Sequence, residues 1–297
     1  MLKSLLHWRL SSFYFFYFAT IGALVPYWNH YLKDLGFNDA EIGELIAIVL
    51  VTKVVAPNVW GWIADHTGKR VQIVRLASLL SVICFAGVLF NSSYWWLAIV
   101  MLFFSFFWNA SLPQVEAVTM NHLGQDTHHY NAIRIWGSVG FVIAVIVFGQ
   151  WFTASDTIDQ ARAVVGGFIK VREKTTTSTV LPFSVLPYLL LVLFTGIWIS
   201  SMMIPKEEVV KKISRKRPLC ESLCHKNVIF LLLTTFLLQA SHGPYYAFFT
   251  RYLEESGHVD KAGYLWAWAV VAEIIIFVYM HRLLQRFGAR NLFLVAF

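Results

Sequence analysis

Residues 61–70 read Gly-Trp-Ile-Ala-Asp-His-Thr-Gly-Lys-Arg, a short polar segment between two long apolar runs. The first glycine lets neighbouring helices approach closely, and the second permits a tight turn. The carboxylate can meet the positive end of a neighbouring helix, and the two basic residues hold the segment on the cytoplasmic side of a membrane. The segment is therefore predicted to be a tight loop between two membrane-spanning helices.

The composition supports a membrane protein. Of the 297 residues, 58% are hydrophobic and 14% are charged, whereas a soluble domain carries about 25% charged residues. A spanning helix needs about 20 mostly apolar residues. Eight such stretches occur, at 10–31, 42–63, 71–90, 94–117, 135–152, 182–204, 227–249 and 262–283. A ninth begins at Asn291 and is cut off at Phe297. The predicted fold class is an all-α integral membrane protein.

An internal repeat organises these segments. Four positions recur at one offset, since Gly43, Lys53, Gly68 and Arg70 match Gly263, Glu273, Gly288 and Arg290. Parallel repeats of this kind build the two halves of many transporters, so four more segments are expected after the eighth. The predicted domains are a six-helix N-terminal bundle at 1–204, a basic cytoplasmic linker at 205–226 and a partial C-terminal bundle at 227–297.

The basic residues set the predicted orientation. Most Lys and Arg residues fall in connections on one side, which places the N-terminus in the cytoplasm and the protein in the inner membrane. The formal charge of +7 does not form a stripe, so nucleic acid is not an expected partner. Residues 153–181 are predicted to form a long external loop, because they are too polar to span.

The pattern G-x-x-x-D-x-x-G-[KR]-[KR] at residues 61–70 resembles the signature loop of the major facilitator superfamily. The resemblance implies the major facilitator fold, with a complete N-terminal six-helix bundle and the first helices of a second bundle. It also implies that the loop gates conformations and does not touch substrate. The expected gating residues are Gly61, Asp65, Gly68, Lys69 and Arg70.

Residues 109–117 and 134–141 carry a second resemblance. They are similar to the oligosaccharide:proton symporter branch typified by lactose permease, and to the phenylpropionate permease family. The matching carboxylate and arginine line the central cavity in that branch, which implies that Glu116 and Arg134 bind substrate. A buried carboxylate is costly without a cation, so a Glu116–Arg134 pair is also physically reasonable. Trp136 is a candidate stacking surface for an aromatic or sugar ring.

Lone polar residues inside apolar helices form a third group. Lys53 lies midway along the second segment, and a buried lysine there needs a counter-charge such as a substrate carboxylate. Glu273 and His242 are the candidates for proton coupling. Their surroundings most resemble the phenylpropionate permease family. Lactose permease differs, since its carboxylate falls at Val270, one helical turn away, and it has no cation at the Lys53 position.

These resemblances imply a secondary active transporter that moves a small organic solute with protons by alternating access. An aromatic acid such as 3-phenylpropionate is favoured, and a sugar, an oligosaccharide or a nucleoside is the alternative. A non-functional truncated fragment is a third reading. The chain is not expected to be an enzyme, because H-E-x-x-H, G-x-S-x-G and G-x-x-x-x-G-K-[ST] patterns do not occur.

No cofactor and no metal are expected. Cys220, Cys224 and His225 lie close in sequence, but nothing supplies a fourth ligand. The expected partners are a small-molecule substrate, protons and the lipid bilayer, and the family likeness implies a monomer.

Overall fold

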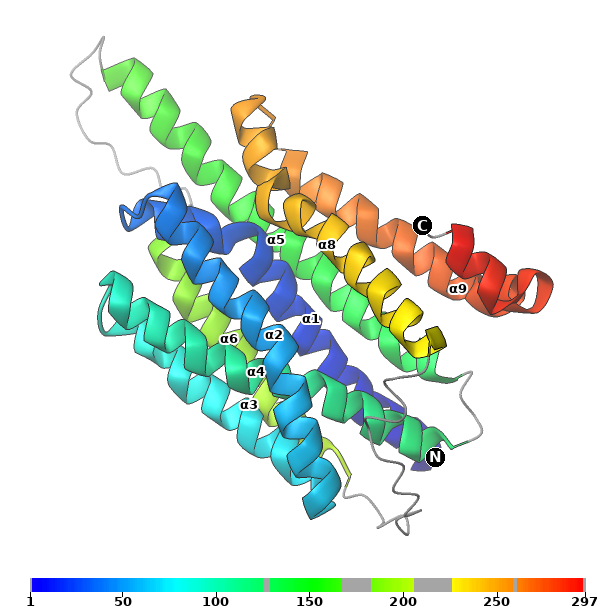
Figure 1. Cartoon of the computed structure of the whole chain (residues 1–297). Coiled ribbons are helices and arrows are strands. Elements are labelled where there is room, and N and C mark those ends of the chain that lie inside the picture. The colour runs from blue at the N-terminus through cyan, green and yellow to red at the C-terminus, as the bar shows by residue number, and fades with distance from the viewer. Residues whose placement is uncertain (1, 125–128, 167–182, 206–225, 259–260, 296–297) are drawn as a thin grey trace. The chain divides into compact units, whose positions relative to one another are not determined.

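The computed structural model describes residues 2–124, 129–166, 183–205, 226–258 and 261–295, and the regular elements in these ranges are helices (Figure 1). In chain order they are α1 (Leu2–Asp34), α2 (Asp39–Thr67), α3 (Arg70–Ala86), η1 (Gly87–Leu89), α4 (Tyr94–Leu123), α5 (His129–Gly166), η2 (Phe183–Val185), α6 (Leu186–Met203), α8 (Lys226–Glu255) and α9 (Ala262–Val295). The predicted all-α class is confirmed.

Six helices are long and apolar enough to cross a membrane, within the described residues. They span His7–Asp34, Asp39–Thr67, Arg70–Leu89, Tyr94–Leu123, Tyr130–Gly149 and Leu186–Met203. These spans coincide with the first six predicted segments, while α8 and α9 are helices at the seventh and eighth. The chain is thus a multi-pass membrane protein.

The chain divides into two compact units. One comprises Met1–Glu207 with Gly263–Val278, and the other comprises Glu208–Ala262 with Tyr279–Phe297. The predicted domain boundaries stay predictions, and residues 206–225 of the predicted linker at 205–226 lie outside the described residues.

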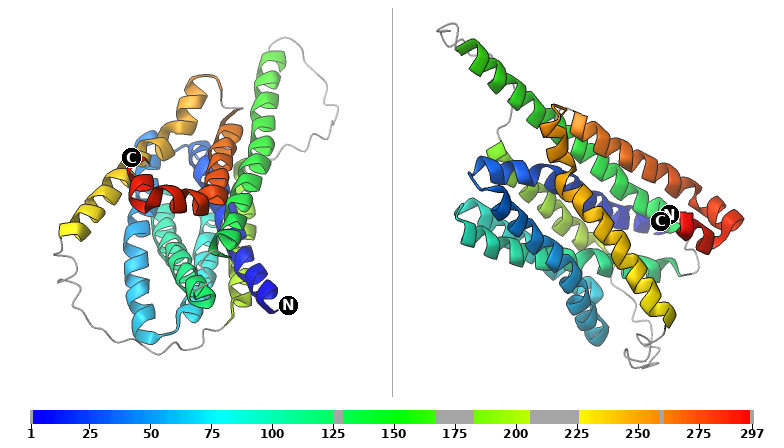
Figure 2. Two further views of the ribbon diagram at one scale, coloured as in Figure 1. Left: turned by 90° about the vertical axis from the view of Figure 1, so that its right-hand side faces the viewer. Right: turned by 45° about the horizontal axis from the view of Figure 1, so that its top comes forward.

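The first six helices pack as a bundle (Figures 1 and 2). In it α1 contacts α5 and α6, α4 contacts α2 and α3, and α3 contacts α6. Large buried rings fill the centre. The Phe85 ring lies 5.1 Å from Phe104 and 4.8 Å from Phe194, centroid to centroid, and Trp108 lies 5.6 Å from Phe194. Aromatic residues therefore form the centre of this bundle.

Glycines bring α1 close to its two neighbours. A Cβ added at Gly140 of α5 would lie 2.3 Å from the carbonyl oxygen of Phe15, and one at Gly196 of α6 would lie 2.4 Å from the Phe16 ring. Small residues at such crossings let membrane helices gain van der Waals contact. These two positions therefore set the distance of α1 from α5 and α6.

A buried polar group joins α2 to α4. Thr52 donates to the Ser105 hydroxyl at 2.7 Å, and the Asn109 amide donates to the Thr52 hydroxyl at 3.2 Å. All three side chains are buried. Hydrogen bonds between helices satisfy such groups where water is absent, and so they fix the register of α2 against α4.

Arg75 binds the end of α6. Its guanidinium donates to the carbonyl oxygens of Ser201 at 3.3 Å, Met202 at 3.1 Å and Ile204 at 2.8 Å. The last carbonyls of a helix lack partners within the helix and carry partial negative charge. One side chain from α3 therefore caps α6.

The external loop was predicted to begin at residue 153, and this boundary is wrong. Residues 153–166 continue α5, which has 38 residues and a length of about 57 Å, against a hydrocarbon core of about 30 Å. Figures 1 and 2 show this end of α5 extending past the ends of α1 to α4. The segment contains no proline and no glycine before Gly166, so its polarity ends the membrane span without ending the helix. Residues 167–182 lie outside the described residues.

The repeat has a structural counterpart. Gly68 ends α2 with φ 67°, and Gly288 interrupts α9 with φ 71° and ψ 156°. Both glycines occupy the left-handed region, which disfavours residues with a Cβ. The break at Gly288 separates the eighth predicted segment from the start of the ninth.

Candidate functional site

The loop after α2 is built as the sequence predicts. The Gly68 N–H donates to the Ala64 carbonyl at 2.8 Å, and the positive φ of Gly68 turns the chain towards α3. A C-terminal glycine of this kind satisfies a helix carbonyl and stops the helix in one step. The predicted tight turn at Gly68 is confirmed.

Arg70 connects this loop to α4. It forms an ion pair with Asp65, and its Nη1 donates to Oε1 of Gln114 at 3.0 Å. Gln114 is only 2% exposed, and a Cβ at Gly61 would lie 3.7 Å from its Nε2. The sequence suggested a helix end as the partner of Asp65, whereas its partner in the structure is a guanidinium. Lys69 is exposed, and the gating role of the loop stays a prediction.

Glu116 lies two residues beyond Gln114 on α4. Its carboxylate shares a hydrogen bond with Tyr130 of α5, and the charge of Arg134 acts on it. The Tyr130 side chain also shares a hydrogen bond with Tyr14 of α1. Three helices therefore meet around this carboxylate, and the predicted Glu116 and Arg134 lie in one electrostatic environment.

The Arg134 guanidinium lies over the ring of Phe18, with Cζ 3.9 Å from the ring centroid. Its Nη1 is buried and has no hydrogen-bond partner among the residues that the structure describes. A buried charged donor without a partner is costly, unless a ligand supplies the acceptor. Arginine is suited to that role, because its planar fork matches a carboxylate.

Trp136 packs against another tryptophan. Its ring centroid lies 5.1 Å from that of Trp8 on α1, and the two side chains are 36% and 61% exposed. Two residues along a helix are about 200° apart. Arg134 and Trp136 therefore leave α5 in different directions. The stacking role of Trp136 stays a prediction.

The remaining predicted site residues are Lys53, Glu273 and His242. Lys53 is exposed on α2, and Glu273 is exposed on α9. His242 belongs to α8, but its side chain lies outside what the structure describes. Their proposed roles are therefore still predictions.

Sequence reasoning missed Gln114, Tyr130 and Phe18. A signal existed for Tyr130, which precedes Arg134 by one helical turn and so shares its face of α5. Phe18 stands in an aromatic-rich run of α1 and carries no distinguishing signal. Gln114 lies within the similar stretch at residues 109–117 but carries no signal of its own.

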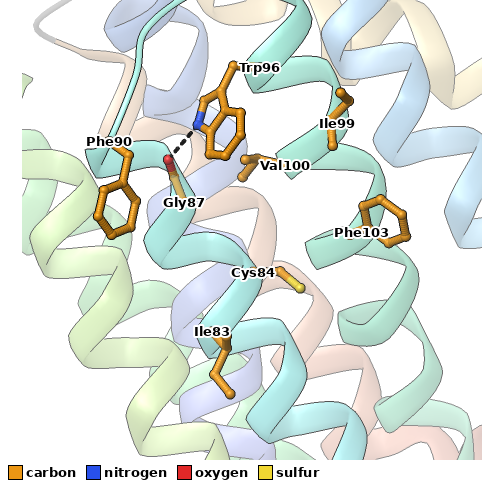
Figure 3. A pocket seen from close by; sticks show the side chains of 8 residues that line it. All are labelled: Ile83, Cys84, Gly87, Phe90, Trp96, Ile99, Val100 and Phe103. Atoms are coloured by element: carbon orange, nitrogen blue, oxygen red, sulfur yellow. Dashed lines mark hydrogen bonds between the residues drawn. The ribbon is translucent and has the colours of Figure 1, made fainter.

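A separate groove of about 550 Å³ opens between α3, η1 and α4, at the end of α3 away from Arg70 (Figure 3). Its walls include Ile83, Cys84, Phe90 and Phe103, and the Trp96 Nε1 donates to the Gly87 carbonyl beside it at 2.8 Å. A solute site needs a few polar groups to orient its ligand. This almost wholly apolar groove therefore lacks the features of the predicted substrate site.

No cluster of metal-ligating side chains occurs within the described parts of the chain. Cys220, Cys224 and His225 lie outside them.

Comparisons with known proteins define the family. The sequence model of the MFS_1 like family matches residues 7–297. The chain is 30% identical to the "Probable 3-phenylpropionic acid transporter" of Escherichia coli (strain K12), over 97% of this chain and 70% of that protein. It is also 30% identical to "Maltose permease" of Geobacillus stearothermophilus, over 46% of this chain and 35% of that protein.

A solved structure shares the fold. The nucleoside transporter NupG superposes with a TM-score of 0.69 at 17% identity, covering 96% of this chain and 69% of that one. The signature at residues 61–70, the six membrane-length helices and the matched family model agree with one another. The chain therefore belongs to the MFS_1 like family of the major facilitator superfamily, whose members are membrane transporters and not enzymes.

Proposed function

We propose that this chain acts in proton-coupled symport of a small organic anion across the inner membrane by alternating access. An aromatic acid such as 3-phenylpropionate is the favoured substrate. The observation that carries this proposal is the Arg134 guanidinium, whose buried Nη1 has no hydrogen-bond partner among the described residues. The similarity to the Escherichia coli protein named for 3-phenylpropionic acid supports the same substrate class.

Proton coupling follows from the charges around Arg134. The Glu116 carboxylate already lies within its electrostatic reach. A substrate carboxylate at Nη1 would place two negative charges beside one cation in a membrane-spanning bundle. Two neighbouring negative charges repel each other strongly in a low-dielectric site, which favours the protonated form of one of them. One carboxylate therefore takes up a proton. Anion and proton then enter together. Glu273 and His242 are proposed to complete the proton route.

Lys53 and Trp136 are proposed to contribute to substrate binding. Lys53 offers a second cation on α2, and Trp136 offers part of an aromatic face beside Trp8. The residue types of both suit an aromatic acid, because the acid has an anionic head for the lysine and an apolar ring for the tryptophan.

The loop at residues 61–70 is proposed to gate the site through α4. Arg70 binds Gln114, and Glu116 lies half a helical turn further along the same helix. A rearrangement of the loop is therefore passed to the carboxylate through one rigid element. The N-terminus is proposed to be cytoplasmic, as the distribution of basic residues indicates.

The test is ligand binding and flux in lipid vesicles that contain the chain. We expect saturable binding of 3-phenylpropionate, weaker binding of 3-phenylpropionamide, and alkalinisation of the outer medium during uptake of the acid. Equal affinity for the acid and the amide would refute the anion proposal. Uptake of the acid without proton movement would refute the coupling.

A sugar is the second candidate, because the maltose permease relative matches nearly half of the chain. Maltose is therefore included as a competing ligand, with uridine for the nucleoside alternative. Binding of either one in preference to the acid would replace the favoured substrate.

A further inference from the structure

We propose that Phe18 is a positioning residue for substrate recognition, because its ring face holds the Arg134 guanidinium in one pose. Gly137 supplies the space that this pose requires. The inference rests on the proposed function for its ligand, a carboxylate, but the geometry stands by itself.

The contact between Phe18 and Arg134 joins α1 to α5. Cζ of Arg134 lies 3.9 Å from the centroid of the Phe18 ring, so the cation rests on the negative face of the ring. Such contacts are strongest where water is excluded. Phe18 is partly buried and packs against the core of the bundle, which keeps its ring in place.

Gly137 lies beside both the Arg134 guanidinium and the Phe18 ring. It follows Arg134 by three residues and so faces the same direction from α5. A Cβ at this position would lie 3.0 Å from Nη1 of Arg134 and 2.7 Å from Cδ2 of Phe18. The guanidinium and the edge of the Phe18 ring therefore both lie against the bare backbone of Gly137, where a side chain would displace them.

This arrangement restrains the guanidinium without using all of its hydrogen bonds. A ring face attracts the cation but accepts no N–H bond of ordinary strength, and Nη1 has no acceptor among the described residues. The Glu116 carboxylate has Tyr130 as its hydrogen-bond partner. Arg134 is thus held in place with a donor uncommitted, which is what recognition of a planar carboxylate requires.

The test compares Phe18→Leu with Phe18→Tyr in the full chain. Leucine removes the ring face, whereas tyrosine retains it. The first readout needs no substrate: the rate at which phenylglyoxal modifies Arg134, followed by peptide mass spectrometry. We expect the rate to rise at least fivefold in Phe18→Leu and to stay within twofold of the unsubstituted protein in Phe18→Tyr.

Fluorinated phenylalanines at position 18 provide a variant that keeps the shape of the side chain. Each added fluorine withdraws charge from the ring face and weakens its attraction for a cation. We expect the modification rate to increase stepwise with the number of fluorines. The proposal would be overturned if the modification rate of Arg134 were unchanged both by fluorination and by Phe18→Leu.

The second readout is the affinity for 3-phenylpropionate and for 3-phenylpropionamide. We expect Phe18→Leu to weaken binding of the acid about tenfold and to leave that of the amide within twofold, since only the acid uses the Arg134 charge. Equal losses for both ligands would show a merely structural role. If the unsubstituted protein binds neither ligand, the proposed function fails, while the phenylglyoxal rates still decide the role of Phe18.

Discussion

Replacing Gly140 by alanine is expected to force α1 and α5 apart. The added Cβ would lie 2.3 Å from the carbonyl oxygen of Phe15, and such atoms do not approach closer than 3.0 Å. A displacement of about 0.7 Å or more is therefore required. Both groups belong to helix backbones, so neither can rotate away, in contrast to a flexible side chain.

Overpacking of this kind costs about 1–3 kcal/mol. With roughly 2–4 °C per kcal/mol for a domain of 150–250 residues, the midpoint of thermal unfolding should fall by roughly 2–12 °C. The assay is tryptophan fluorescence of the detergent-solubilised protein during heating. A second readout is the phenylglyoxal reactivity of Arg134, which should rise because Phe18 and Arg134 lie on the two helices that separate.

Gly43→Ala is the matched control. Gly43 is also a helical glycine, but an added Cβ there meets nothing within 4 Å. Alanine favours a helix over glycine by up to about 1 kcal/mol, so this variant should unfold at the same temperature or slightly higher. The reasoning is refuted if Gly140→Ala unfolds at the same temperature as Gly43→Ala.

Four further predictions concern the site, the bundle and the orientation. Arg134→Gln should weaken 3-phenylpropionate binding at least about tenfold, by loss of charge complementarity, and Glu116→Gln should abolish the proton movement that accompanies uptake, since an amide cannot take up the proton; near-normal affinity in the first variant or proton-coupled uptake in the second rejects the role. Lys53→Gln should reduce the preference for the acid over its amide, measured by competition binding, and an unchanged preference removes Lys53 from recognition. Arg75→Gln should destabilise the bundle by about 1.5–3 kcal/mol through the uncapped α6 carbonyls, with only partial rescue by lysine, and an unshifted unfolding midpoint contradicts the cap. A single cysteine at Lys69 should resist an impermeant maleimide in intact cells and react in inverted vesicles; labelling in intact cells reverses the orientation.

The spans were predictable because a bilayer demands about 20 apolar residues whatever the helices pack against. The turn at Gly68 was predictable for a similar reason, since a left-handed residue between two helices favours glycine. The offset of the internal repeat identified its counterpart at Gly288, where φ is also positive. The polarity of residues 153–166 led to the wrong prediction of a loop there. The cost of transferring a side chain into lipid and the propensity to form a helix are different properties.

The candidate site was predictable only in part. Glu116 and Arg134 stand out because charges inside a span are costly. Phe18 and Gln114 do not, because each is one of many similar residues, and their roles depend on contacts with residues far away in the chain. Which aromatic ring supports the cation is decided by the crossing of α1 and α5.

The two arginines near the start of α3 give the bundle unequal ends. Arg70 binds α2 and α4, and Arg75 binds the last residues of α6, all within the first turns of one helix. At the other end, α3 adjoins α4 along an open apolar groove. A force applied to the chain after Ile204 is therefore transmitted from α6 to α3 through Arg75, and from α3 to α2 and α4 through Arg70. We expect these four helices to move together as a single body at that end, and to separate from one another, if at all, only at the opposite end.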